Sequence, residues 1–237
     1  MAVTAKDFTG ETMLGVHGPN ATEKVAWFED FLKGYHNDRS NTELCDIMNR
    51  QKSDKGSGWH TYTQFYNSLF APRRNQDLNV FEVGLGTNNV DVESSMGTGG
   101  TPGASLRGWR EFFPRARIYG ADVDKRVLFR EYRIETFYVD QTNPGAIKEM
   151  WSIVGDVEFD IMIDDGLHQY HASAALMQNS IHKLAKGGIY IVEDIVVQPD
   201  NIANYNKLLA ATGKTAILVY LPSTQNAYDN CVCAIWN

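Results

Sequence analysis

Two patterns of apolar positions divide the chain. In the first part, apolar side chains recur at helical spacing, as at Val25, Phe28 and Leu32. In the second part, short apolar runs alternate with helical patterns. We therefore predict a helical N-terminal extension over residues 1–76 and a core over residues 77–237, which together form one structural unit.

The core pattern predicts strands separated by helices. The predicted strands contain NVFEVG, ARIYGADVD, TFYVDQ, FDIMIDDG and GGIYIVED. Such alternation favours parallel strands joined by right-handed crossovers, and nearly continuous apolar runs indicate strands covered on both faces. The last two runs, AILVYL and CVCAIWN, predict a closing antiparallel pair. The predicted fold class is therefore α/β, with a doubly wound, mostly parallel, Rossmann-like sheet.

Polar residues gather where these strands end. In a doubly wound sheet, ligands bind at the carboxyl ends of the parallel strands. The residues at these ends are Glu82, Gly84, Gly86, Asp122, Asp124, Asp140, Gln141, Asp164, Asp165, His168, Glu193 and Asp194. The many acidic residues at this edge of the sheet predict a binding site there.

The first strand end has the glycine spacing of a nucleotide-binding loop, from Glu82 to Gly86, but lacks the third glycine. A tight strand-to-helix turn needs the same glycines, so both interpretations stand. Residues 88–103 form an unusually long polar loop, which is typical of a lid, a binding loop or a disordered segment. Asp122 stands where an acid accepts hydrogen bonds from ribose hydroxyls, and Asp140 where one holds an adenine amino group. An ordinary solvated turn acid is the alternative for each.

Three acids predict a metal site. Asp165 ends one strand, and Glu193 and Asp194 end the next, which should be its neighbour in the sheet. Converging carboxylates raise one another's pKa unless a cation neutralises them. Oxygen ligands suit Mg²⁺, or another divalent cation such as Mn²⁺. The alternative is that Glu193 and Asp194 are exposed loop acids.

A histidine lies beside these acids. His168 follows Asp165 by three residues, and an imidazole with a pKa near neutrality suits a general base. His171, one turn further along the predicted helix, is the competing candidate.

Composition excludes several classes of protein. Lys and Arg number 22 against 29 Asp and Glu, a net charge of −7 without a basic run, which disfavours nucleic acid and anionic membranes as partners. No apolar run is long enough to span a membrane, and the start MAVTAKDFTGE lacks the features of a secretory signal. Three cysteines favour a reducing compartment, so we predict a cytoplasmic protein. Cys231 and Cys233 are interpreted as buried thiols rather than a metal pair.

Four stretches together resemble the class I SAM-dependent methyltransferases. More narrowly, the chain is similar to the Mg²⁺-dependent O-methyltransferases that modify macrolide sugars, of the mycinamicin and macrocin type. The stretches are SDKG with His60 and Tyr62; EVGLGTN with GASLRGWREFFPRARIYGADVD; FYVDQTNP; and FDIMIDDGLHQYH with GGIYIVEDI. They cover about two thirds of the chain. The enlarged loop 88–103 and the short N-terminal region depart from the family pattern.

The resemblance implies roles by position. It makes Asp165, Glu193 and Asp194 the metal ligands and His168 the general base. It implies S-adenosyl-L-methionine (SAM) as the cofactor, with contacts from Glu82, Gly84, Ser105, Asp122, Asp140, Gln141 and Asp164. It implies a SAM- and Mg²⁺-dependent O-methyltransferase that acts on a hydroxyl of a sugar or glycosylated small molecule. A homo-oligomer is compatible with it.

Other functions stay open from the residues alone. A catechol-like phenol O-methyltransferase shares the metal topology but has a lysine in place of His168. A nicotinamide-dependent oxidoreductase would use the same crevice, but it would need a better glycine pattern and has no use for the three acids. A non-catalytic binding module is disfavoured by the intact acids and histidine. The aromatic residues Trp59, Tyr62 and Trp109 suit either stacking on a sugar or filling the core.

Overall fold

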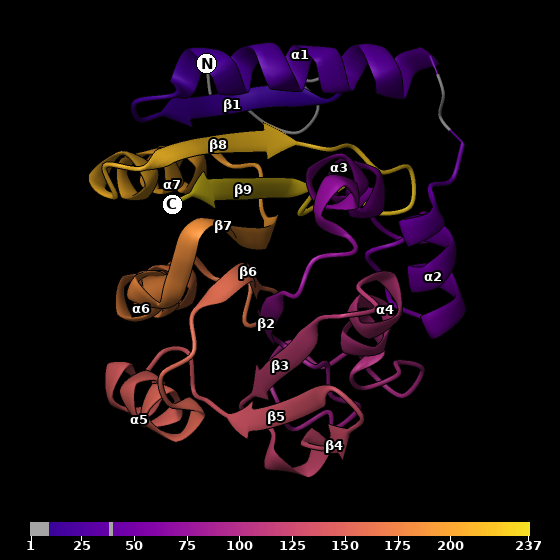
Figure 1. Cartoon of the computed structure of the whole chain (residues 1–237), viewed down its shortest axis with the longest axis vertical. Helices are drawn as coiled ribbons and strands as arrows, with labels where there is room; N and C mark the ends of the chain where they lie inside the picture. The colour runs from indigo at the N-terminus through magenta and orange to yellow at the C-terminus, as the bar shows by residue number, and fades with distance from the viewer. Residues whose placement is uncertain (1–9, 38–39) are drawn as a thin grey trace.

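One nine-stranded sheet runs through the molecule. The structure is a computed structural model and describes residues 10–37 and 40–237. Its strand order is β1-β8-β9-β7-β6-β2-β3-β5-β4 (Figure 1). The strands are β1 (Thr12–His17), β2 (Asn79–Val83), β3 (Arg117–Asp122), β4 (Arg130–Glu131), β5 (Ile134–Tyr138), β6 (Phe159–Asp164), β7 (Leu184–Ile195), β8 (Thr215–Tyr220) and β9 (Cys231–Trp236).

Seven α-helices cover the sheet. They are α1 (Ala21–Asn37), α2 (Glu43–Gln51), α3 (Tyr62–Phe70), α4 (Ala104–Phe112), α5 (Pro144–Val154), α6 (Tyr170–Ser180) and α7 (Pro199–Ala211) in the described part of the chain. Short 3-10 turns at Ala71–Arg73, Lys125–Val127 and Ile181–Lys183 complete the elements. Among the described residues, no helix has the length and apolar character that a membrane crossing requires.

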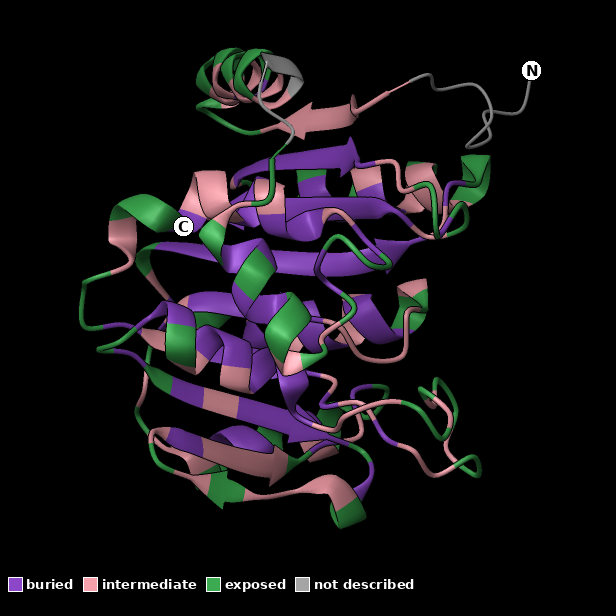
Figure 2. Ribbon diagram, turned by 90° about the vertical axis from the view of Figure 1, so that its right-hand side faces the viewer, coloured by how far each residue is buried: buried purple, intermediate pink, exposed green. Residues whose placement is uncertain are grey.

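The alternating side chains of the central strands feed two cores. Val80 of β2 packs in one core with residues of α1 to α4, whereas its neighbour Phe81 packs in the other with residues of α5 to α7. The same alternation separates Ile161 from Met162 in β6. Figure 2 shows the resulting buried sheet between partly exposed helices. The predicted doubly wound, mostly parallel α/β fold is confirmed.

The parallel strands and the closing pair follow the prediction. The strands β5, β3, β2, β6 and β7 pair parallel with one another in that order, while β9 pairs antiparallel with both β7 and β8, and β4 pairs antiparallel with β5. The order reverses between β2 and β6, because the chain moves outward in one direction from β2 to β5 and in the other from β6 onward. Such a switch point is where doubly wound sheets bind ligands.

The N-terminal region differs from the prediction in one element. It contains a strand as well as helices: β1 pairs antiparallel with β8 and extends the sheet at its outer edge. The sequence TMLGVH is only partly buried and is interrupted by Gly15, so it gives a weak strand signal by itself. Its pairing with β8 supplies the missing partner. Residues 1–9 and 38–39 of the predicted extension lie outside the described residues. They include most of MAVTAKDFTGE, the segment that we predicted not to be a secretory signal.

Candidate functional site

A large cavity lies at the carboxyl ends of the parallel strands. Its volume is about 890 Å³, and it is bounded by the ends of β2, β3, β5 and β6, by the loop 88–103 and by the segment 52–54. Predicted site residues that line it are Gly84, Ser105, Asp122, Asp140, Gln141, Asp165 and His168. Glu82, Asp164, Glu193 and Asp194 do not line it, because they are buried behind its wall.

The glycine turn after β2 needs its glycine for two reasons. Gly84 has a φ of +94°, and a Cβ atom placed on it would lie 1.8 Å from the carbonyl oxygen of Asp165. The turn therefore brings the backbone of β2 against the end of β6. Since Gly84 also lines the cavity, the tight-turn and binding-loop interpretations hold together at this position.

Asp122 organises the same turn. Its Oδ2 accepts a hydrogen bond from the backbone N–H of Leu85 at 2.8 Å, and its Oδ1 accepts one from the N–H of Asp124 at 2.8 Å. Burial raises the pKa of the Asp122 carboxyl, although these N–H donors oppose the rise. Its side chain is 7% exposed and borders the cavity, so it is not a solvated turn acid. Its ribose-binding role stays a prediction.

The next strand end carries two different side chains. The Asp140 side chain is hydrogen-bonded to Thr142. The backbone N–H and the hydroxyl of Thr142 both donate to Asp140 Oδ1, at 2.9 and 2.6 Å. Gln141 instead bridges two parts of the β6 end, donating from Nε2 to Asp164 Oδ1 at 3.0 Å and accepting from the Leu167 N–H at 2.8 Å. Gln141 therefore also fixes the loop that precedes His168.

Asp164 and Glu82 are buried acids beside the cavity. Burial raises the pKa of Asp164 to about 6 and that of Glu82 to about 7. Glu82 accepts hydrogen bonds from the Ser105 hydroxyl and from Trp109 Nε1. Trp109 is fully buried in the core, so of the two roles suggested for this side chain, the structure shows the packing role.

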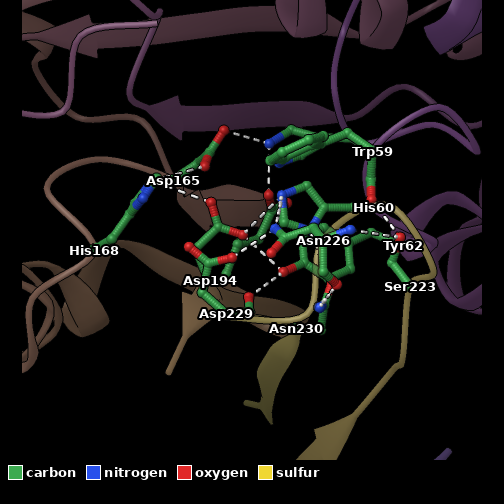
Figure 3. A network of polar contacts seen from close by, with 12 residues as sticks. Trp59, His60, Tyr62, Asp165, His168, Asp194, Ser223, Asn226, Asp229 and Asn230 are labelled. Carbon is green, nitrogen blue, oxygen red and sulfur yellow. Dashed lines mark hydrogen bonds and ion pairs between the residues drawn. The ribbon is translucent and has the colours of Figure 1, made fainter. Parts of the chain in front are cut away.

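Two of the three predicted metal ligands face the predicted base. His168 Nε2 lies 3.3 Å from Asp165 Oδ1 and 3.2 Å from Asp194 Oδ2 (Figure 3). One potential ligand atom from each of these three residues lies within 4.8 Å of the other two, which is a spacing that suits a single cation. His171 is exposed and lies outside this cluster.

The third predicted ligand has a different neighbour. Glu193 is buried, and its carboxylate accepts hydrogen bonds from Lys55 Nζ and the Tyr66 hydroxyl, both at 2.6 Å. Lys55 Nζ also contacts Asp165 Oδ2 at 2.5 Å. The ammonium group of Lys55 thus lies between Asp165 and Glu193. It neutralises part of the negative charge that we expected a metal cation alone to neutralise. Neither Glu193 nor Asp194 is an exposed loop acid.

Further residues around the acids were not predicted from the chemistry of the sequence. The Tyr62 hydroxyl donates a hydrogen bond to Asp194 Oδ1 at 2.7 Å, and His60 Nε2 lies 3.5 Å from the same oxygen. Asp229, in the loop before β9, forms a second candidate cation cluster with His60 and Asp194. The SDKG segment, with the following His60 and Tyr62, supported the family resemblance. However, this segment reads as a polar loop far in sequence from the acids, so no physical signal indicated that Lys55 would be buried beside them.

Backbone strain coincides with this cluster. His168 and Asp194 both have positive φ values, +58° and +55°, which are uncommon for residues with a side chain. Such conformations persist where the surrounding structure imposes them and often mark functional sites. His168 and Asp194 both lie in the cluster with these backbone conformations, and His168 Nε2 contacts both Asp165 and Asp194 (Figure 3).

The acids control the charge of His168. Burial by itself would lower its pKa, but the hydrogen bond to Asp165 and the negative charge of Asp194 raise it from 6.5 to about 10. Asp165 conversely has its pKa lowered to about 2, because the Lys55 and His168 charges outweigh its burial. Without an added cation, these contacts favour the protonated form of His168, which cannot act as a base.

The strand order and the site at its switch point define a class I methyltransferase fold. A solved O-methyltransferase from Bacillus cereus shares this fold, with a TM-score of 0.51 and 11% identity over 90% of this chain and 99% of that one. No protein-family model matches the chain.

Within this class, the chain is similar to antibiotic sugar O-methyltransferases. It is 34% identical to the 8-demethyl-8-alpha-L-rhamnosyl tetracenomycin-C 2'-O-methyltransferase of Streptomyces olivaceus, over 79% of this chain and 41% of the relative. It is 32% identical to the mycinamicin VI 2''-O-methyltransferase of Micromonospora griseorubida, over 65% of this chain and 36% of the relative. The resemblance predicted from the sequence is thereby confirmed.

The solved structures agree with these relatives. MycE methyltransferase from the mycinamycin biosynthetic pathway, in complex with Mg and SAH, matches with a TM-score of 0.55 and 31% identity over 66% of this chain and 38% of that chain. A second MycE structure also contains mycinamycin VI. The chain spans about two fifths of the length of the curated relatives it matches.

Proposed function

We propose that this protein is a SAM- and divalent-cation-dependent O-methyltransferase that acts on a hydroxyl of a sugar or a glycosylated small molecule. The observation that carries the proposal is the cluster of Asp165, His168 and Asp194 beside a cavity of about 890 Å³. The relatives that methylate rhamnosyl tetracenomycin and mycinamicin VI, and MycE with its Mg and SAH, support this choice of reaction and cofactors.

The residues of the chain fit both cofactors. Asp165 and Asp194 offer carboxylate oxygens at a spacing that suits Mg²⁺, and Glu193 could join them if Lys55 moved away. Asp122 and Gly84 border the cavity where the ribose and methionine parts of SAM would lie. The acid-rich wall also suits a cationic sulfonium group.

His168 would take the proton in the proposed reaction. A bound divalent cation would lower the pKa of an acceptor hydroxyl and offset the negative charge that keeps His168 protonated. His168 then accepts the hydroxyl proton at Nε2, while the acceptor oxygen forms a bond to the methyl carbon and the carbon–sulfur bond breaks. In the structure, Asp165 and Asp194 contact this same nitrogen, so ligation of the cation by their carboxylates would free Nε2 to accept the proton. The held geometry removes much of the entropic cost of bringing the two reactants together.

A direct assay tests the proposal. The purified chain is incubated with SAM, Mg²⁺ and a panel of rhamnosides, other glycosides and catechols, and methylated products are sought by mass spectrometry. We expect a mass gain of one methyl group on a glycoside, its loss when a chelator is added, and binding of SAM but not NAD by calorimetry. Methylation of catechols alone would favour the phenol O-methyltransferase, and binding of NAD in place of SAM would overturn the assignment. The cytoplasmic location, the homo-oligomer and the division at residue 76 stay predictions.

A further inference from the structure

Lys55 brings a positive charge into the acid cluster. Its Nζ lies 2.5 Å from Asp165 Oδ2, 2.6 Å from Glu193 Oε2 and 3.9 Å from Glu82 Oε1. The Lys55 side chain is 1% exposed, so little solvent screens these contacts. The ammonium group therefore occupies the side of the cluster where a divalent cation would meet both Asp165 and Glu193.

The surrounding fold holds Lys55 in this place. Its backbone carbonyl accepts a hydrogen bond from the N–H of Thr63, the second residue of α3, at 3.3 Å. Its own N–H donates to Ser53 Oγ at 3.4 Å. The helix α3 also supplies Tyr66, whose hydroxyl donates to Glu193 Oε1 at 2.6 Å. One short stretch of chain thus delivers the ammonium group and a second partner for the same carboxylate.

Both oxygens of each of these two acids already have a partner. Asp165 contacts His168 through Oδ1 and Lys55 through Oδ2. Glu193 accepts from Tyr66 with Oε1 and from Lys55 with Oε2. In the described part of the chain, Lys55 is the only cationic side chain that contacts both acids. Because a divalent cation and an ammonium group repel each other, the two would compete for these oxygens.

A displaced ammonium group has a further partner close by. The Glu82 carboxylate lies 3.9 Å from Lys55 Nζ and is itself fixed by hydrogen bonds from the Ser105 hydroxyl and Trp109 Nε1. The flexible four-carbon stem of a lysine lets its ammonium group turn toward Glu82 while the backbone stays in place. The exchange of partners therefore leaves no isolated charge in the core, where such a charge would be very costly.

From these contacts, we infer that Lys55 is an internal counter-ion that competes with the divalent cation for Asp165 and Glu193. It keeps the two acids together when no metal is bound, and it weakens metal binding so that the cation is held reversibly. This inference rests on the proposed function for the identity of the metal ligands, but metal binding alone tests it, without turnover.

A purely structural role for Lys55 gives the opposite expectation. If Lys55 only held the acids in position, its loss would let them move apart, and the metal affinity would fall or stay the same. If Lys55 competes with the metal, its loss removes one positive charge and frees two ligand oxygens, so the metal affinity rises. The direction of the change in affinity therefore distinguishes the two roles.

A titration with Mn²⁺ as the probe measures this direction. Mn²⁺ is added to the wild type, Lys55→Met and Lys52→Met, and the free ion is followed by electron paramagnetic resonance. We expect Lys55→Met to raise the Mn²⁺ affinity about tenfold or more, the scale of one charge removed from a buried site. Lys52 is exposed and lines the cavity in the same segment, so Lys52→Met is the matched control and should change the affinity little. An affinity of Lys55→Met that equals or falls below that of the wild type overturns the inference.

A double-mutant cycle identifies the contested oxygens and decides the question even if Lys55→Met does not fold. Glu193→Gln is measured alone and together with Lys55→Met. The double variant loses one charge of each sign, so the buried charge stays balanced. We expect Glu193→Gln to lower the Mn²⁺ affinity about fivefold or more in the Lys55→Met background but only slightly in the wild type, where Lys55 holds this carboxylate. The double variant should also bind Mn²⁺ more tightly than Glu193→Gln alone, and equal affinities of these two proteins overturn the inference.

Turnover separates this inference from the proposed function. If the wild type methylates a glycoside with SAM and Mg²⁺ but Lys55→Met binds Mn²⁺ no more tightly, the competition fails and the proposed function stands. If Lys55→Met binds Mn²⁺ more tightly but the wild type forms no methylated product, the competition stands and the proposed function fails. The absence of Mn²⁺ binding in the wild type and in all variants overturns both.

Discussion

Single residues decide how the acid cluster balances its charge. Lys55 places one ammonium group among Asp165, Glu193 and Glu82, and these carboxylates hold its pKa well above the usual value even though burial opposes this. The strand-end pattern was sufficient to predict the three acids. It was not sufficient to predict Lys55, because the contact joins residues 110 positions apart and a lysine in a polar loop looks like a solvated residue.

Removal of Lys55 tests its role as a fixed counter-charge. Lys55→Met leaves buried carboxylates without their partner, and breaking such a pair costs about 3–5 kcal/mol. We expect urea denaturation to show a loss of this size, with partial recovery when Mg²⁺ is added. Lys148→Met, an exposed position in α5, is the control and should change little. A loss no larger than that of the control would show that Lys55 is not needed for stability.

Asp165 should dominate cation binding. Its Oδ1 contacts His168 and its Oδ2 contacts Lys55, so Asp165→Asn removes the central negative charge of the cluster. We expect Mn²⁺ affinity, measured by electron paramagnetic resonance, to fall about tenfold or more, a scale typical of damage to a metal site. Asp156→Asn, at an exposed position, should retain wild-type affinity. Equal affinities in both variants would remove Asp165 from the ligand set.

The raised pKa of His168 gives a pH dependence with a definite sign. Because the folded-state pKa is about 10 and the usual value is 6.5, the interaction stabilises the fold fully below pH 6.5 and is lost as the pH rises toward 10. In the absence of divalent cations, we expect the wild type to lose more stability than His168→Gln between these pH values. NMR titration of the ring should show a protonated imidazole at pH 8. A ring that is neutral at pH 8 would contradict the charge balance described above.

At the scale of elements, the sequence predicted the parallel core well and its edges poorly. Apolar runs such as IMI in β6 and IYIV in β7 are nearly continuous because both faces of these strands are covered. The edge strands β1 and β4 are only partly buried, and β4 has only two residues, so their pairing depends on a partner that no local pattern reveals. The same limit explains why Asp229 was missed, since it joins the site through a loop that follows no regular element.

The turn after β2 offers a test at this scale. Gly84→Ala would force a Cβ atom against the Asp165 carbonyl as well as a strained φ, whereas Gly187→Ala has a similar φ of +74° with open space around it. The strained φ alone costs about 1–2 kcal/mol. We therefore expect Gly84→Ala to lose clearly more stability than Gly187→Ala in urea denaturation, and to weaken SAM binding. Equal losses would mean that the close approach of β2 and β6 relaxes without cost.

At the scale of the whole molecule, the sheet brings the cavity and the acid cluster to one edge. The cavity borders the ends of β2, β3, β5 and β6, the acid cluster adds Asp194 from the end of β7, and His168 belongs to both. The N-terminal segment contributes Lys55, His60 and Tyr62 to the cluster although it precedes the Rossmann-like core. The stability of the molecule and the charge of its site are therefore coupled.

This coupling predicts how the whole fold responds to its cofactor. A ligand that binds only the folded state at 100 times its Kd adds about 2.7 kcal/mol to the free energy of unfolding. We expect SAM to raise the melting temperature of the wild type accordingly. In Asp122→Asn the backbone N–H groups of Leu85 and Asp124 lose their charged acceptor, so the turn that borders the cavity loosens and the increase shrinks. Asp77→Asn, which alters an exposed ion pair with Arg115, should keep the full increase. If SAM stabilised the Asp122 and Asp77 variants equally, the acid at the end of β3 would have no part in holding the cofactor, and the cavity would have to bind it through its other walls.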